Sequence, residues 1–121
     1  MPDERRTEYP ALAWAPAAAR SDLADYLASE GRFELIPVAV LLVSELITNA
    51  CLHATEPIVL RAGLAANTLH VEVDDCTRVS CDPCVRDGHG RGLQIVSAYA
   101  TTWGHSQRDG SGRTSWFELI A

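Results

Sequence analysis

The sequence IPVAVLLVSELITNACLHA, residues 36–54, decides the fold because it carries one formal charge, Glu45, in an otherwise neutral and largely apolar stretch. Pro37 is a favoured first-turn residue, and Pro57 ends the pattern, so a helix is predicted from about Pro37 to Ala54. A helix that is apolar nearly all round is expected to be buried. Burial of its single carboxylate would then cost free energy, which marks Glu45 as a candidate functional residue.

Glu45, Asn49 and His53 follow one another at four-residue spacing. On a helix they fall within an arc of about 80° and form one polar stripe. Two interpretations stay open. The stripe lines a binding or catalytic site, or Glu45 bonds to neighbouring backbone while Asn49 and His53 are hydrogen-bonded core residues.

Apolar periodicity on either side of this helix predicts the remaining elements. Before it, the pattern predicts a polar arm over residues 1–10, a short edge strand over 11–14, and a helix over 16–30 whose core positions are Ala19, Leu23, Tyr26 and Leu27. After it, we expect strands 58–64 and 69–74 joined by a turn at 65–67, a third helix carrying Leu93, Ile95, Val96 and Tyr99, and strands 102–108 and 114–120. This order predicts one α+β domain over residues 11–121, with helices on one face of a mostly antiparallel mixed sheet.

The length, charge and apolar content of the chain limit the kinds of protein to which it can belong. A length of 121 residues fits one domain. Ten basic residues, all Arg, against sixteen acidic ones give a net charge of −6, which argues against a nucleic-acid-binding module. No segment reaches the ~20 uninterrupted apolar residues of a membrane helix. The polar start of the chain does not resemble a signal peptide, so we expect a cytoplasmic protein with reduced cysteines.

Asp75 is the second candidate site residue. In the predicted strand, Leu69, Val71 and Val73 share one face because side chains alternate, and Asp75 falls on that same core-facing side. An inward carboxylate requires a donor, such as an amino group of a nucleobase or a backbone N–H. An Asx-turn at the strand end is the structural alternative.

The third feature is the glycine-rich run from Gly88 to Leu93, Gly-His-Gly-Arg-Gly-Leu, just before the third predicted helix. Glycines at a helix N-terminus let backbone N–H groups approach a phosphate. The spacing matches neither the P-loop nor the dinucleotide fingerprint, and a flexible glycine hinge explains the run equally well.

Together, in this order, these motifs resemble the Bergerat-type (GHKL, histidine kinase-like) ATP-binding fold. The resemblance is closer to anti-sigma-factor serine/threonine kinases and to short actinobacterial ATP-binding regulatory proteins. It covers roughly residues 10–121. The motifs that carry it are Ser44–Ala54, which resembles the family's N box, Val71–Asp75, Gly90–Leu93 and Gly112–Phe117.

The resemblance implies ATP and Mg²⁺ as cofactors. It assigns Asn49 to the Mg²⁺ that bridges the phosphates, Glu45 to the base that orients the attacking hydroxyl, and Asp75 to adenine. It assigns Thr114 to a water-mediated adenine contact. The other nucleotide-binding positions that it implies are His53, Gly88, Gly90, Arg91, Gly92 and Leu93. Arg91 would either offset charge on the γ-phosphate or be a solvated arginine of the lid.

The activity implied is that of a kinase phosphorylating a small STAS-like anti-anti-sigma protein, and of a sigma-factor-sequestering protein that can dimerise. The alternative is a non-catalytic ATP-binding switch. Glu45 favours the kinase, whereas Thr77 and Val79 favour the switch, because they stand where the family has its first glycine box.

Cys76, Cys81, Cys84 and His89 lie inside the segment that the resemblance makes the ATP lid. Four such ligands in a short loop are able to form a tetrahedral zinc site. A redox-active pair and unrelated lid cysteines are the alternatives. A zinc- or redox-gated interaction module is therefore a third hypothesis.

Overall fold

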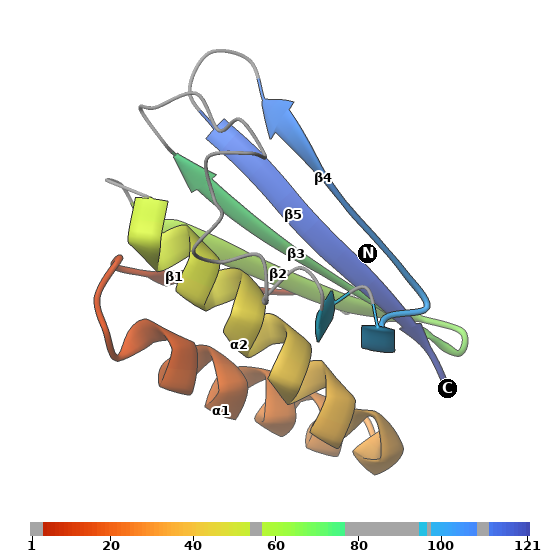
Figure 1. The fold of residues 1–121 in the computed structure, drawn as a ribbon. Coiled ribbons are helices and arrows are strands. Elements are labelled where there is room, and N and C mark those ends of the chain that lie inside the picture. Colours follow the sequence, from red (N-terminus) through yellow and green to blue (C-terminus); the bar gives the residue numbers. More distant parts are fainter. Residues whose placement is uncertain (1–3, 54–56, 77–94, 97, 109–111) are drawn as a thin grey trace.

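The computed structural model describes residues 4–53, 57–76, 95–96, 98–108 and 112–121. Its helices and strands are β1 (Arg5–Tyr9), α1 (Ala15–Ser29), the 3₁₀ turn η1 (Phe33–Leu35), α2 (Ile36–His53), β2 (Ile58–Ala65), β3 (Thr68–Cys76), β4 (Thr102–Arg108) and β5 (Gly112–Ile120). The strands form one sheet in the order β1-β2-β3-β5-β4, and both α-helices lie on one face of it (Figure 1). The predicted α+β class is confirmed. We call the face toward the helices the inner face and the opposite one the outer face.

Every pairing between the described strands is antiparallel, so the expected mixed sheet is wrong for this part of the chain. The reason lies in the short connections. A tight turn joins β2 to β3, and few residues separate β4 from β5, and such hairpin connections require antiparallel pairs. The turn between β2 and β3 is Ala66-Asn67, as predicted, and Ala66 has a φ of 55°.

The edge strand predicted over residues 11–14 is wrong. It lies earlier, at β1, within the expected polar arm, and residues 11–14 form a bend and turn leading into α1. The alternation of side chains along the strand explains why it lies over residues 5–9. Tyr9 pairs with Ile58 and is buried in the core. On the same side of the strand, the Arg5 guanidinium carbon lies 5.2 Å from the centre of the Tyr26 ring. Charged side chains between these positions conceal the strand in the sequence.

The core lies between the inner face and the two helices. The predicted core positions of α1 are all buried: Ala19, Leu23, Tyr26 and Leu27. By length and composition alone, Phe33–Leu52 is apolar enough to cross a membrane, with a mean hydropathy of 2.0. In the fold this stretch includes α2, which packs against α1 and against β2, β3 and β5.

Part of the third predicted helix is described. Ile95, Val96, Ala98 and Tyr99 are helical, and Val96 is fully buried. The beginning of this helix, Leu93 included, lies outside the described residues.

Candidate functional site

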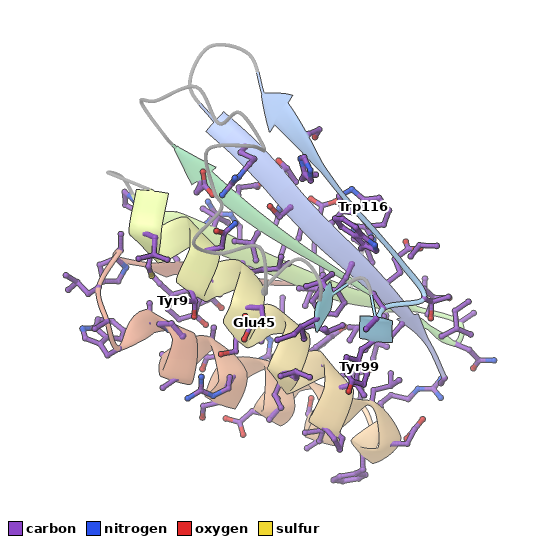
Figure 2. All side chains as sticks on the ribbon, viewed as in Figure 1. Tyr9, Glu45, Tyr99 and Trp116 are labelled. Atoms are coloured by element: carbon purple, nitrogen blue, oxygen red, sulfur yellow. The ribbon has the colours of Figure 1, made fainter. Side chains whose placement is uncertain are left out.

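The polar stripe of α2 begins at Glu45, which lies midway along the helix (Figure 2). Glu45 and Asn49 are both half-buried. The Oδ1 atom of Asn49 is itself buried, and no hydrogen-bond donor reaches it from the described residues. A buried carbonyl oxygen without a donor is costly, so this atom is suited to an electropositive ligand. His53 ends α2, and its side chain is outside the described part.

The helix that carries the stripe is not buried all round, contrary to the sequence-based expectation. Leu41 is 36% exposed and Leu52 is 53% exposed. Together with Glu45 and Thr48, these residues follow a spacing of four, three and four and therefore form one ridge along the helix. The candidate base is thus flanked by apolar surface that another protein can contact.

Asp75 occupies the inward position that strand alternation predicts. Its exposure is 2%, and Leu69, Val71 and Val73 on the same side of β3 are also buried. Figure 1 shows that the C-terminal ends of α2 and β3 lie at the same end of the molecule, together with the beginning of β5. The end of the stripe and the end of β3 that carries Asp75 therefore lie toward the same end of the molecule.

Arg113 is a site residue that the sequence interpretation missed. It is directly opposite Asp75 in the β3–β5 pairing, its side chain is 3% exposed, and its Nη2 atom lies 3.5 Å from Asp75 Oδ2. The sequence contains a signal for this position. Counting back by twos from the core residue Phe117 gives Arg113 on the inner face.

The same alternation places Thr114 on the other side of the sheet from Asp75. Thr114 lies on the outer face, where its Oγ1 donates a hydrogen bond to Asp74 Oδ1 over 2.6 Å. The sheet therefore separates Thr114 from Asp75, and the described structure does not bring these two residues together. The inner-face position beside Asp75 belongs to Arg113 instead.

The outer face carries a charged network that was not predicted. Arg61 pairs with Glu72 and Asp74, and the ring nitrogens of His70 lie 2.7 Å from Glu72 Oε2 and 2.9 Å from Glu118 Oε2. Partial burial lowers the pKa of His70, but hydrogen bonds to the two carboxylates outweigh it and raise the pKa above the ordinary value of 6.5. The Trp116 ring stacks on His70 at 5.7 Å between centroids.

Several predicted site residues lie outside the described part of the chain. They are Gly88, Gly90, Arg91, Gly92, Leu93, Cys81, Cys84 and His89. Cys76 ends β3, but its side chain is also outside that part. Within residues 4–53, 57–76 and the described positions from 95 onward, no group of three or more His, Cys, Asp or Glu side chains is arranged to hold a metal ion.

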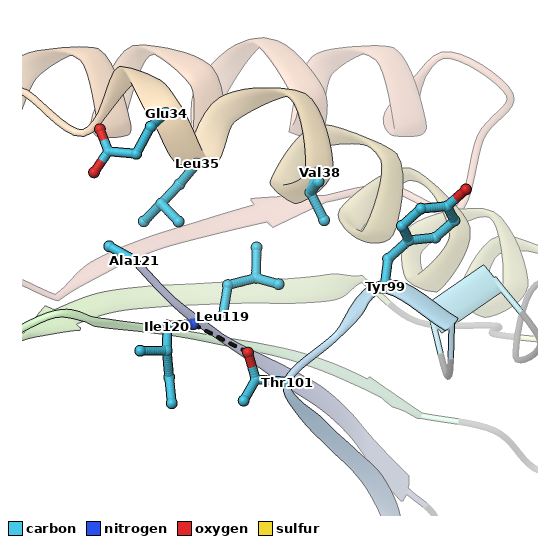
Figure 3. Close-up of a pocket in the computed structure, with 8 residues that line it drawn as sticks. All are labelled: Glu34, Leu35, Val38, Tyr99, Thr101, Leu119, Ile120 and Ala121. Carbon is cyan, nitrogen blue, oxygen red and sulfur yellow. Dashed lines mark hydrogen bonds between the residues drawn. The ribbon is translucent and has the colours of Figure 1, made fainter.

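A pocket of about 310 Å³ lies elsewhere, between the start of α2 and the end of β5 (Figure 3). Leu35, Val38, Leu119 and the half-exposed Tyr99 contribute to its largely apolar lining. Asp75 pairs with Arg113 near the opposite end of β5, about 20 Å away at the rise of an extended strand. The pocket is therefore separate from the candidate site.

No protein-family model matches the chain, and no curated protein matches it significantly.

Proposed function

We propose that this protein binds ATP with Mg²⁺ and acts as a cytoplasmic serine/threonine kinase of the anti-sigma-factor type. Its substrate in this proposal is a serine of a STAS-like anti-anti-sigma protein, and it also sequesters a sigma factor. The observation that carries the proposal is the buried Oδ1 of Asn49, which has no donor among the described residues.

The chemistry of Asn49 fits the cation. Mg²⁺ prefers oxygen ligands and keeps several water and phosphate oxygens, so one neutral amide oxygen from the protein is sufficient. When bound, Mg²⁺ neutralises charge on the phosphates. Asn49 would hold the ion, and this role would satisfy the one buried side-chain acceptor of α2 that the described structure leaves without a donor.

The carboxylate of Asp75 is suited to binding adenine. A carboxylate that is 2% exposed on the inner face is able to accept a hydrogen bond from the exocyclic amino group of adenine. Val73 and Val71, its neighbours on the same face, are buried in the core and make its surroundings apolar. The two ends of the ligand would thus be held from β3 and from α2.

Glu45 would act on the protein substrate. Its half-buried carboxylate is accessible from the ridge that Leu41 and Leu52 make apolar. In the proposed reaction Glu45 accepts the proton of the partner's serine hydroxyl, a role worth typically 10²–10⁴-fold in rate. The exposed leucines would contact the partner beside that serine.

The same ridge favours a second candidate function, which is ATP-dependent capture of a regulator without phosphorylation. Exposed leucines support docking whether or not phosphate is transferred. The two functions differ in the need for Glu45.

The test is phosphate transfer from labelled ATP to candidate STAS proteins by the wild type, Glu45→Gln and the control Glu30→Gln, which changes an exposed carboxylate at the end of α1. We expect the wild type and Glu30→Gln to transfer phosphate, and Glu45→Gln to bind ATP but lose at least 100-fold in rate. Capture of the partner without labelling by all three proteins would favour the switch. Absence of ATP binding by the wild type would contradict both functions.

A further inference from the structure

The turn that precedes α1 carries two large apolar side chains on the surface. Leu12 and Trp14 are each 53% exposed. The stretch around them, residues 10–19, contains no charged side chain, although the chain as a whole is acidic. Exposed apolar surface without charge is typical of the centre of protein–protein interfaces, where tryptophan is enriched. Residues 11–14, which we call the Trp14 turn, therefore have the composition of a docking surface.

The Trp14 turn lies against the end of α2. The Sγ atom of Cys51 is 3.6 Å from the carbonyl oxygen of Leu12. Figure 1 shows the loop between β1 and α1 running beside the C-terminal end of α2. Leu52, the residue that follows Cys51, is also 53% exposed. Two adjacent segments of the chain thus contribute exposed apolar residues to this part of the surface.

Leu52 connects the Trp14 turn to the candidate base. It is the last residue of the ridge formed by Leu41, Glu45, Thr48 and Leu52. At the rise of an α-helix, Leu52 lies about 10 Å along the axis from Glu45. A standard interface buries about 800 Å² on each partner, which is a patch roughly 30 Å across. A protein whose serine hydroxyl reaches Glu45 would therefore also cover Leu52 and the Trp14 turn.

Backbone hydrogen bonds hold the Trp14 turn in place without a partner. The Leu12 N–H donates to the Pro10 carbonyl oxygen over 2.8 Å, and the Ala15 N–H donates to that of Leu12 over 3.0 Å. The carbonyl oxygen of Trp14 accepts from the Ala18 N–H over 3.2 Å. A backbone that is already ordered loses little entropy on binding, and tryptophan offers a large contact area with only two rotatable bonds. Trp14 is therefore suited to anchor another protein.

We infer that Trp14 and Leu12 are specificity-determining residues, which anchor the protein substrate through an apolar patch that this substrate carries beside its phosphorylated serine. The inference rests on the proposed function and names the surface that selects the substrate. The net charge of −6 opposes binding to an anionic membrane, so the apolar turn favours a protein as its partner. Because Trp14 binds the substrate away from the reacting atoms, it should determine KM for the protein substrate and leave kcat unchanged.

The experiment measures phosphate transfer from labelled ATP by the full chain, at increasing concentrations of the STAS protein that the wild type labels. Trp14→Ala should raise KM for that protein at least tenfold, as for the loss of a buried aromatic anchor, and leave kcat and ATP affinity within about twofold. Leu12→Ala should change KM in the same direction by a smaller factor. Phe33→Ala is the matched control, because Phe33 is an aromatic residue with 64% exposure just before the other end of α2, and it should behave as the wild type does.

A conservative variant separates contact from folding. Trp14→Phe keeps an aromatic ring at the same place and should keep KM within about threefold of the wild-type value, so it remains informative if Trp14→Ala does not fold. The wild-type tryptophan fluorescence should become less accessible to acrylamide when the STAS protein binds. Trp14→Phe should lack this change, because its remaining tryptophans are Trp103 and Trp116.

The outcomes distinguish the inference from the proposed function. An unchanged KM in Trp14→Ala, or an equal rise in Phe33→Ala, would overturn the role of Trp14 while phosphate transfer stands. With KM unchanged, a lower mass of Trp14→Ala by light scattering would mean that the turn joins two copies of the chain. Loss of binding to phosphatidylserine–phosphatidylcholine vesicles would instead mean that it contacts a membrane. A wild type that labels no STAS protein would overturn the kinase function and the inference with it.

Discussion

Asp74 and Asp75 are consecutive residues of β3 whose carboxylates face opposite sides of the sheet. Asp75 points inward and lies beside Arg113, whereas Asp74 points outward and is bound by Arg61 and Thr114. Both residues are buried, Asp75 at 2% exposure and Asp74 at 7%. The two residues are therefore chemically identical and similarly buried, and they differ mainly in the side of the sheet on which their carboxylates lie.

This pair predicts that only one of the two substitutions weakens ATP binding. Asp75→Asn should weaken ATP binding at least tenfold, because an amide presents a donor as well as an acceptor to the amino group of the base. Asp74→Asn should leave ATP affinity within about twofold and instead lower the free energy of unfolding by about 2 kcal/mol, since it weakens charged hydrogen bonds. Calorimetry and urea unfolding of both variants check this. Equal ATP affinities for the two variants would contradict it.

Gly104 in β4 is required by its neighbour Trp116. A Cβ atom at position 104 would lie 2.9 Å from the indole ring, so Gly104→Ala should displace the ring and cost about 1–3 kcal/mol of stability. Gly63→Ala is the control, because a Cβ there would meet its nearest atoms at an ordinary 3.9 Å. Urea unfolding of both variants measures the effect. A Gly104→Ala protein as stable as Gly63→Ala would show that Trp116 does not pack as described.

The β2–β3 turn predicts a stabilising substitution. Ala66 has a φ of 55°, in the left-handed region that costs a non-glycine residue about 1–2 kcal/mol. After allowance for the greater freedom of glycine in the unfolded chain, Ala66→Gly should raise the free energy of unfolding by about 0.5–1 kcal/mol. Ala65→Gly, one residue earlier in β2, should lower it. Thermal unfolding of both variants tests whether the gain in stability is specific to position 66.

The pKa values of His70 and Glu118 predict how stability depends on pH. Burial opposes the charge on His70, but Glu72 and Glu118 raise its pKa above 6.5, so its charged form stabilises the fold fully below about pH 6.5, and this contribution is lost as the pH rises through the folded-state pKa. Hydrogen bonds from His70 and Thr102 lower the pKa of Glu118 below 4.5. The Glu118 contribution is therefore present above about pH 4.5 and is lost as the pH falls through the folded-state pKa.

The measurement is the difference in unfolding free energy between the wild type and His70→Gln across the pH range 4–9. We expect the difference to be largest between about pH 4.5 and 6.5 and to shrink at higher pH. Trp116 stacks on His70, so its fluorescence should report the same titration. A difference that stays constant across the range would mean that the His70 network does not control stability.

Much of the fold follows from periodicity. Strand alternation predicted the burial of Asp75 with Leu69, Val71 and Val73, and helical spacing predicted the core face of α1. The strand β1 escaped prediction because Arg5 and Glu8 make its sequence polar, and tertiary pairing with β2 outweighs that local pattern.

The site was predicted less completely for a different reason. Arg113 was assigned no role because the motif drew attention to its neighbour Thr114, although the parity of Phe117 places Arg113 inward. The outer network of His70 and Glu118 depends on β5 pairing with β3, and the strand order is not encoded in local pattern. Contacts between residues far apart in sequence therefore required the fold to be known.

The central claim is that Asn49 holds Mg²⁺ for a bound ATP, and calorimetric titration with ATP, with and without Mg²⁺, tests it most directly. The wild type should bind ATP in a Mg²⁺-dependent manner. Asn49→Ala should bind at least tenfold more weakly and lose that dependence, whereas Asn67→Ala, at the exposed β2–β3 turn, should behave as the wild type does. A wild type that binds no ATP, or an Asn49→Ala protein that binds it with unchanged affinity and Mg²⁺ dependence, would contradict the account.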